Sequence, residues 1–328
     1  MRALIVLTIA ACNYSPQAAA PGGDSDGPAG DGGPPDTGDA PPDSFVGPPP
    51  TPCVTRWLTD DLDFANPAFL RQGGDNLATT ADERDPFLSS TELELYYTKA
   101  GSGGDLDVIV ATRSSLASPF GSLGSTSTSL SDSNLGDGKV TMTADDLTAI
   151  VSSLRAEGEG NFDFWQATRT AAGTQAFPTL TQTFLAEVND NDQQQDPYLS
   201  GDGLRLYYAA SSPQKLVVAS RVAQLASFGA PVDIPVINDG DGSADPTLSG
   251  DERVILFTSS RAGGDGLTDL WYATRDERDQ PFGTPVNVPQ VNGSDDDGDA
   301  HLSADGCRLY FASTRGVGDY DVLFTQLQ

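Results

Sequence analysis

The residues best suited to chemistry are aspartates in short acidic clusters, two of which combine Asp with Gly. They read NDNDQQQD at 189–196, NDGDGSAD at 238–245 and GSDDDGDA at 293–300, with a shorter ADERD at 81–85. Hard cations such as Ca²⁺ take oxygen ligands from loops of this composition. The candidate cation ligands are Asp190, Asp192, Asp239, Asp241, Asp245, Asp295, Asp297 and Asp299. Because no cluster has the EF-hand spacing with its closing Glu, solvated acidic loops remain the alternative.

Other chemistry is weakly represented. The single histidine, His301, would have to serve any Ser-His-Asp arrangement, and no Gly-x-Ser-x-Gly elbow is present. Phosphate-binding Gly motifs and CxxC pairs are also missing from the sequence. The formal net charge of −29 argues against nucleic-acid partners, whose phosphates need Lys and Arg. The sequence therefore predicts a protein that is not an enzyme and has no cofactor, apart from the Ca²⁺ option.

The elements that carry these clusters are repeated five times. The repeats span 85–113, 139–169, 196–221, 245–275 and 299–325, so their starts lie 54, 57, 49 and 54 residues apart. Each contains two short apolar β-rich runs joined by a turn-rich segment, the pattern of a hairpin. Repeats of this length made only of strands are typical of propeller blades, which bury their faces against their neighbours.

The repeat has a recognisable consensus. Asp-Pro-x-Leu-Ser-x-Asp-Gly-x-x-Leu-Tyr-Phe, followed by Arg…Gly…Asp-Leu-Trp, resembles the WD-like (PD40) repeat of TolB-type β-propellers over residues 85–325. The resemblance implies an all-β propeller, and it leaves function open because this fold hosts both binding scaffolds and enzymes.

The ends of the folded region are expected to complete one blade together. Residues 53–84 are too short for a blade, and the fifth repeat lacks the downstream segment that earlier repeats possess. We therefore predict five blades, closed by an outer strand from the N-terminal segment, which removes exposed sheet edges. Six blades remain an alternative. Segments such as 227–238 and 281–292 are assigned one strand per blade.

Most motif residues have structural interpretations. Lys99, Arg155, Arg261 and Arg315 recur near the hairpin start, and Asp107, Asp163, Asp269 and Asp321 recur on the return strand. We expect ion pairs or hydrogen bonds within each blade from these two sets. Trp165 and Trp271 are expected to pack between blades, and Tyr207, Tyr208, Tyr310 and Phe311 to lie in the core. His301 is interpreted as a turn residue at the position where three repeats have Pro.

The N-terminus predicts export. MRALIVLTIAAC has a short basic start, a short apolar run and a lipobox-like Ile-Ala-Ala-Cys, so residues 1–12 are interpreted as a lipoprotein signal ending at the lipidated Cys12. Asn13 favours the outer membrane by analogy with bacterial sorting. Residues 13–52 are rich in Pro, Gly and Asp and predict a disordered tether, and residues 53–328 form the propeller.

Cys53 and Cys307 are predicted to form a disulfide, because an exported protein meets an oxidising compartment and the closure model joins the two ends. The sequence thus predicts a lipid-anchored, non-catalytic scaffold of the cell envelope, facing the periplasm or cell surface. Its partner is an envelope protein or a glycan, and it contacts the membrane only through the lipid. The alternatives are a five-bladed glycosidase and a Ca²⁺-dependent carbohydrate or ligand binder.

Overall fold

A computed structural model describes residues 52–328, except 73–74, 77–78, 80, 101–104, 122–124, 128, 133–134, 160, 174–175, 212–213, 240–241 and 317. The described residues lie within one compact unit, Val46–Gln328. The predicted signal and tether, with Cys12, lie outside the described residues. In the described part of the chain, every helix falls short of the length and apolar character that crossing a membrane requires.

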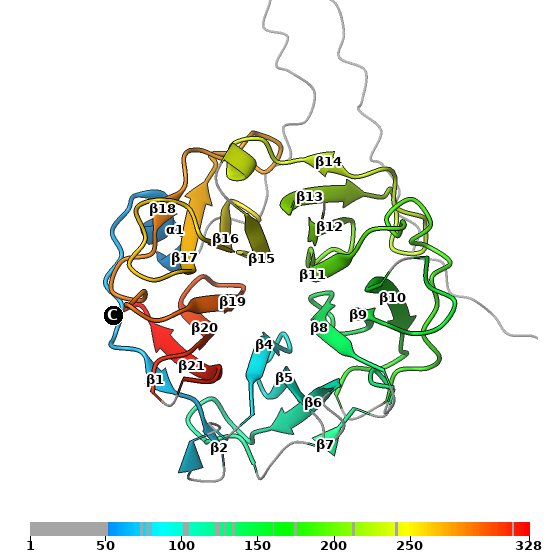
Figure 1. Cartoon of the computed structure of the whole chain (residues 1–328), viewed down its shortest axis with the longest axis horizontal. Coiled ribbons are helices and arrows are strands. Elements are labelled where there is room, and N and C mark those ends of the chain that lie inside the picture. The colour runs from blue at the N-terminus through cyan, green and yellow to red at the C-terminus, as the bar shows by residue number, and fades with distance from the viewer. Residues whose placement is uncertain are drawn as a thin grey trace, which may run out of the picture. The chain divides into compact units, whose positions relative to one another are not determined.

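The unit is a five-bladed β-propeller, which confirms the predicted fold class and excludes the six-bladed alternative (Figure 1). Blade one contains β4 (Glu83–Leu88), β5 (Glu94–Ala100), β6 (Leu106–Thr112) and β7 (Ser125–Thr126). Blade two contains β8 (Asp137–Met142), β9 (Thr148–Ser153) and β10 (Asp163–Thr168). Blade three contains β11 (Gln194–Leu199), β12 (Arg205–Ala210), β13 (Lys215–Ser220) and β14 (Val232–Asp233).

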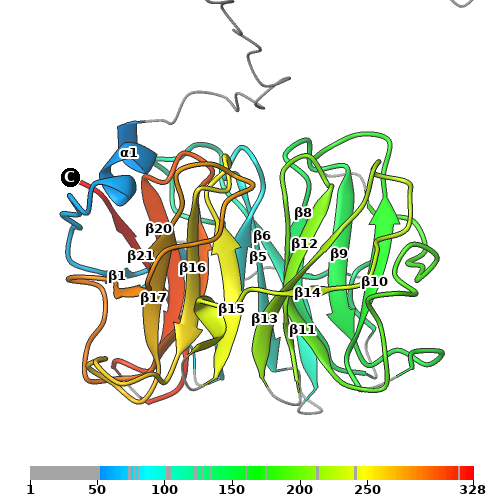
Figure 2. The same cartoon turned by 90° about the horizontal axis from the view of Figure 1, so that it is seen from above.

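Blade four contains β15 (Ser243–Leu248), β16 (Val254–Ser259), β17 (Asp269–Thr274) and β18 (Val286–Asn287). Blade five contains β19 (Asp297–Leu302), β20 (Arg308–Ser313), β21 (Asp321–Gln326) and β1 (Ala68–Phe69). A small hairpin, β2 (Arg71–Gln72) with β3 (Asp75–Asn76), and a 3₁₀ turn, η1 (Ile237–Asp239), complete the strands and turns. Neighbouring strands pair antiparallel throughout, and β4, β8, β11, β15 and β19 surround the axis (Figure 1). Figure 2 shows the same ring turned by 90°.

The ring closes as the sequence predicts. β1 pairs with β21, with Ala68 opposite Phe324, and Phe64 forms a further bridge to Leu327. The outer strand of the fifth blade therefore comes from the N-terminal segment, so its last C-terminal strand has a partner on each side. The outer strands β14 and β18 were also predicted, although each has only two residues. In blade two, the described residues form an isolated bridge at this place, Gln166 to Thr181.

A helix that the sequence did not suggest lies beside the fifth blade: α1 (Pro52–Leu58). Its Trp57 is 1% exposed and donates a 2.8 Å hydrogen bond from Nε1 to the carbonyl oxygen of Gly306. The sulfur atoms of Cys53 and Cys307 are 2.02 Å apart, the length of a disulfide bond. Helix α1 therefore attaches directly to the β19–β20 turn.

In the other four blades, an arginine makes the hydrogen bond that Trp57 of α1 makes in blade five. After the third strand of each, an arginine donates from Nε to a carbonyl of the turn between the first two strands. The donors and acceptors are Arg113 and Glu92, Arg169 and Asp146, Arg221 and Gly203, and Arg275 and Glu252. Each guanidinium also covers a phenylalanine ring at 4.2–4.6 Å: Phe120, Phe177, Phe228 and Phe282. Gly306 is the equivalent carbonyl in blade five, where Trp57 takes the place of the arginine.

Packing between blades supplies the core. Trp165 of blade two clusters with Phe87 and Val108 of blade one, and Trp271 of blade four clusters with Tyr207 and Leu216 of blade three. This confirms the predicted inter-blade role of the two tryptophans. The predicted core residues Tyr207, Tyr208, Tyr310 and Phe311 are all at most 2% exposed.

The predicted ion pairs do form within blades, but with different acids. Lys99 pairs with Glu83 at 2.7 Å, Arg155 with Asp137 at 3.1 Å, and Arg315 with Asp297 at 2.5 Å. The partners thus come from the innermost strand. The acids predicted on the return strand have other roles: Asp269, for example, accepts from the Gly266 amide.

Candidate functional site

The five repeat starts converge on the propeller axis. These positions are Asp85, Lys139, Asp196, Asp245 and Asp299, one from each innermost strand. We call them the channel ring. One carboxylate oxygen from each of Asp85, Asp245 and Asp299 lies within 4.8 Å of the others, although these residues belong to blades one, four and five.

A bulge positions each aspartate of the ring. The innermost strand loses register with its neighbour at this place, for example between Arg84 and Phe87, so the Asp-Pro pair is left out of the ladder. The four aspartates have φ between 51° and 55°, in the left-handed region that Asp tolerates better than most residues. Proline suits the next position because it has no N–H to offer the ladder.

The ring is electrostatically crowded. Burial, followed by the charge of Asp299, raises the pKa of Asp85 to about 6. Burial, followed by the charge of Asp245, raises the pKa of Asp299 to about 6 and also raises that of Asp196 well above its ordinary value. Lys139 opposes all three shifts as a charge inside the ring. The ring therefore favours a bound proton or cation.

Specific contacts hold two of the carboxylates. Arg84 Nε lies 2.9 Å from Asp299 Oδ2, and Thr98 donates a 2.7 Å hydrogen bond to Asp85 Oδ2. Lys139 Nζ donates to the carbonyl oxygen of Ala300 at 3.3 Å. Asp245, 7% exposed, completes the convergent group.

The three converging oxygens fit the size of a hard cation. The three oxygens lie within 4.8 Å of one another. In an equilateral triangle of that largest size the centre would be about 2.8 Å from each corner, close to the 2.3–2.6 Å of Ca²⁺–oxygen bonds. A contraction of a few tenths of an ångström would bring all three into contact with one ion. The donor set contains carboxylates only, which suits Ca²⁺ better than softer metals.

The eight aspartates predicted as cation ligands separate into groups. Asp245 and Asp299 join the channel ring. Asp297 is paired with Arg315, and Asp190 accepts from the side chain of Gln194 and the amide of Asp192. Asp239 ends η1, Asp192 and Asp295 are exposed, and Asp241 lies outside the described residues.

Three members of the ring were missing from the sequence prediction. Asp85, Asp196 and Lys139 are equivalent to Asp245 and Asp299 as repeat starts. Aligning the repeats on the axis, instead of searching for Asp-Gly loops, would have found them. Lys139 shows that one blade supplies an internal cation in place of a fifth carboxylate.

The interpretation of His301 as a turn residue at a proline position was wrong. Ala300 occupies the proline position, and His301 pairs with Tyr310 as Phe87 pairs with Tyr96 and Tyr198 with Tyr207. His301, Phe87 and Tyr198 therefore share one level of the innermost strands, beyond the channel ring.

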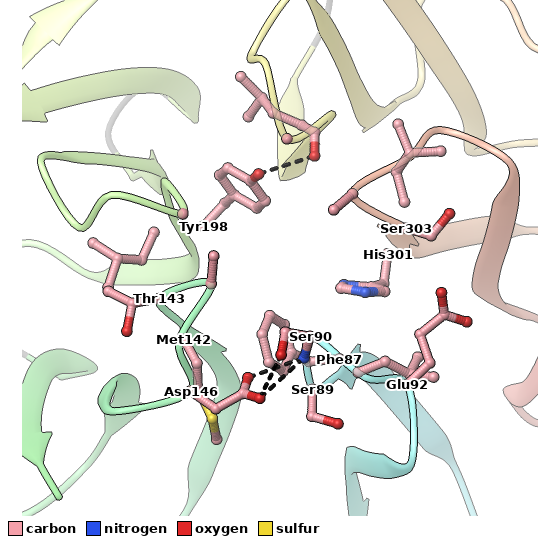
Figure 3. A pocket seen from close by; sticks show the side chains of 18 of the residues that line it. Phe87, Ser89, Ser90, Glu92, Met142, Thr143, Asp146, Tyr198, His301 and Ser303 are labelled. Atoms are coloured by element: carbon pink, nitrogen blue, oxygen red, sulfur yellow. Dashed lines mark hydrogen bonds between the residues drawn. The ribbon is translucent and has the colours of Figure 1, made fainter. Parts of the chain in front are cut away.

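A pocket of about 260 Å³ opens at this level, toward the turns that end the innermost strands (Figure 3). Phe87, Tyr198 and His301 line it from three blades, and the turns of all five blades contribute further residues. Apolar side chains make most of its wall: Leu88, Met142, Ala144, Leu199, Leu248, Leu302 and Ala304.

The carboxylates that line this pocket are all engaged. Glu92 receives two guanidinium hydrogen bonds from Arg308 of the adjacent blade. Asp146 accepts from the amide and hydroxyl of Ser90, again across a blade boundary. Asp305 accepts from the hydroxyl of Ser303 at 2.6 Å. These acids stabilise turns and blade contacts.

Comparisons with known proteins agree with the fold. No family model matches the sequence, and no curated protein matches it. The catalytic domain of an α-L-arabinofuranosidase from Coprinopsis cinerea is similar in structure, with a TM-score of 0.53, 12% identity and coverage of 81% of this chain and 97% of that one. An α-L-arabinofuranosidase from Podospora anserina has a TM-score of 0.52 and 12% identity, over 80% of this chain and 95% of that one. TolB from Acinetobacter baumannii has a TM-score of 0.47 and 12% identity, over 84% of this chain and 68% of that one. At this identity the likeness to the two arabinofuranosidases shows the fold, a β-propeller, and no more.

Proposed function

We propose that this chain is an exported, lipid-anchored β-propeller of the cell envelope that binds a partner or ligand without catalysing a reaction on it. The observation that carries the proposal is the state of the pocket carboxylates: Glu92, Asp146 and Asp305 are each held by donors of the protein. A general acid and base need freedom to exchange protons with a substrate. The pocket thus supplies apolar surface, and the described residues that line it include no free pair of carboxylates.

Export and attachment are supported by the sequence alone. The lipobox-like Ile-Ala-Ala-Cys places the lipid at Cys12, and Asn13 favours the outer membrane. The tether at 13–52 would separate the propeller from the bilayer, so a partner in the periplasm or at the cell surface could reach it. An envelope protein or a glycan is the proposed class of partner.

A glycosidase is the rival function, and the convergence of Asp85, Asp245 and Asp299 is the observation that favours it. Retaining glycosidases place two carboxyl groups about 5–5.5 Å apart and inverting ones about 6.5–9.5 Å apart, with the sugar bond between them. Here one oxygen from each of three carboxylates, instead of two, lies within 4.8 Å of the others, and Arg84 forms an ion pair with Asp299. Three converging carboxylates form a ligand set for a cation, so we propose Ca²⁺ binding as the role of the channel ring.

The experiment that tests the proposal combines labelling with assays of hydrolysis. Metabolic labelling with a fatty acid is expected to tag the wild-type protein and to leave Cys12→Ser unlabelled. The purified protein is expected to leave chromogenic α-L-arabinofuranosides, xylosides and peptides intact. Turnover that disappears in Asp85→Asn or Asp299→Asn would establish the glycosidase instead, and equal labelling of both proteins would remove the lipid anchor.

A further inference from the structure

The pocket at the turn-facing end of the channel is the strongest unassigned feature. We propose that it binds a small neutral aromatic ring carrying one hydrogen-bonding group, the class of phenols and indoles. The inference rests on the proposed binding role and names the ligand class for this pocket. It follows from one unoccupied polar side chain, an otherwise apolar wall and a limited volume.

His301 is the unoccupied polar side chain. It is 8% exposed, and none of the described residues forms a hydrogen bond with its imidazole. Figure 3 shows the ring directed into the pocket. Each ring nitrogen of an imidazole can take part in a hydrogen bond with a ligand.

The other polar side chains of the pocket already have partners. Tyr198 donates to the carbonyl oxygen of Leu248 at 2.9 Å. The hydroxyls of Thr143 and Ser303 donate to the aspartates of their own turns, and that of Ser90 donates to Asp146. The carboxylates are also held. A ligand that fits should therefore need one polar contact and carry no charge.

This balance excludes a sugar as the preferred ligand. A monosaccharide has several hydroxyls, and each that loses water without a new partner costs about 1–3 kcal/mol. A single imidazole cannot compensate for all of them. A phenol or indole has one polar group for His301 and a flat apolar body for the remaining wall.

The aromatic side chains in the pocket wall can pack against the aromatic ring of a ligand. The centroids of Phe87 and His301 are 5.0 Å apart at an interplanar angle of 71°, an edge-to-face arrangement. The volume of about 260 Å³ is just below the range of roughly 300–1,000 Å³ usual for ligand pockets. One ring, with a short substituent, therefore matches the cavity.

The test uses p-cresol as the probe and the purified mature protein made soluble by Cys12→Ser. Titration calorimetry and saturation-transfer NMR would compare p-cresol with toluene, which lacks the hydroxyl, and with methyl glucoside. We expect p-cresol to bind several-fold more tightly than toluene, and methyl glucoside to show no saturable binding. His301→Leu should raise the dissociation constant for p-cresol about 3- to 10-fold, as loss of one hydrogen bond predicts, and leave that for toluene unchanged.

Two rim variants test the location. Ala304→Phe and Ala144→Phe each place a ring in the mouth from an exposed turn position and should abolish binding. Ala117→Phe, an exposed alanine outside the pocket lining, is the matched control and should bind p-cresol normally. Thermal melts verify that each variant is folded.

Wild-type protein that does not bind p-cresol, or binding retained in both rim variants, would overturn the inference. So would methyl glucoside binding more tightly than p-cresol. These results would leave the non-catalytic role standing, because that role fails only on turnover in the hydrolysis assays.

Discussion

The indole nitrogen of Trp57 donates its hydrogen bond to the carbonyl oxygen of Gly306, 249 residues further along the chain. The bond joins α1 to the last blade at a carbonyl that an arginine caps in every other blade. Trp57 also meets Phe64 and Tyr272 edge to face, with centroids 5.5 and 5.1 Å away. Trp57 therefore joins α1 to the fifth blade and also packs in the hydrophobic core.

Replacing Trp57 with Phe should destabilise the propeller through this bond as well as through lost volume. The Gly306 carbonyl would remain buried without its donor, which costs about 1–3 kcal/mol beyond the packing loss. Trp271→Phe is the matched control, because Trp271 is 6% exposed and its Nε1 has no hydrogen-bond partner among the described residues. Denaturant unfolding should show the larger loss for Trp57→Phe. Equal losses would mean that the hydrogen bond contributes nothing measurable.

The disulfide between Cys53 and Cys307 should be the strongest constraint on the unfolded chain. It spans 254 residues, and loop-closure entropy predicts roughly 5 kcal/mol of stabilisation as an upper figure. Cys53→Ser, or a reductant, should therefore lower the denaturation midpoint. Thiol counting on the denatured, unreduced mature protein should find neither cysteine reactive, and two reactive thiols would refute the bridge.

The five blades and their closure could be predicted because both follow from repetition. Each repeat start lies at one place on the axis, and the short fifth repeat needs a strand from elsewhere in the chain. Helix α1 and Trp57 belong to no repeat, so no second copy revealed them. The sequence alignment of the repeats placed His301 one position too early, because Ala300 replaces the proline that marks the register in three other repeats.

Only two of the five residues of the channel ring, Asp245 and Asp299, were predicted, for a different reason. Its aspartates come from separate blades, and their proximity depends on the radius of the closed ring, which no local pattern encodes. Asp245 and Asp299 were included as members of acidic clusters that contain glycine, whereas Asp85 and Asp196 belong to clusters without glycine. Lys139 is a cation at a position where the other repeats have Asp, so a search for acidic ligands does not find it.

The raised pKa values of Asp85 and Asp299 predict that stability rises on mild acidification. Both carboxyls have a pKa of about 6 in the folded protein against an ordinary 3.8, so the native state binds protons more tightly than the unfolded state. Unfolding free energy should therefore increase as pH falls from about 7 to 4, the window between these pKa values, and the gain should level off below it.

Asp85→Asn with Asp299→Asn should flatten this pH dependence, because Asn keeps the shape without the titration. Asp192→Asn, in an exposed loop, is the control that should leave the slope unchanged. Urea unfolding at intervals between pH 4 and 7 measures the slope. A wild-type stability that falls steadily over this range would contradict the prediction.

A calcium site in the channel ring should appear as selective thermal stabilisation. The ion would relieve repulsion among Asp85, Asp245 and Asp299 and bind only the folded protein, so the melting temperature should rise with Ca²⁺ concentration. Melts in Ca²⁺, Mg²⁺ and NaCl at equal ionic strength separate binding from screening, since screening acts alike in all three. Asp245→Asn should abolish the Ca²⁺-specific rise, whereas Asp190→Asn should retain it because Asp190 already bonds Gln194. Identical melting temperatures in the three salts would mean that Lys139 and bound protons, without Ca²⁺, balance the charge of the ring. A rise in melting temperature that is lost only in Asp190→Asn or Asp239→Asn would mean that Ca²⁺ binds in the acidic loops instead.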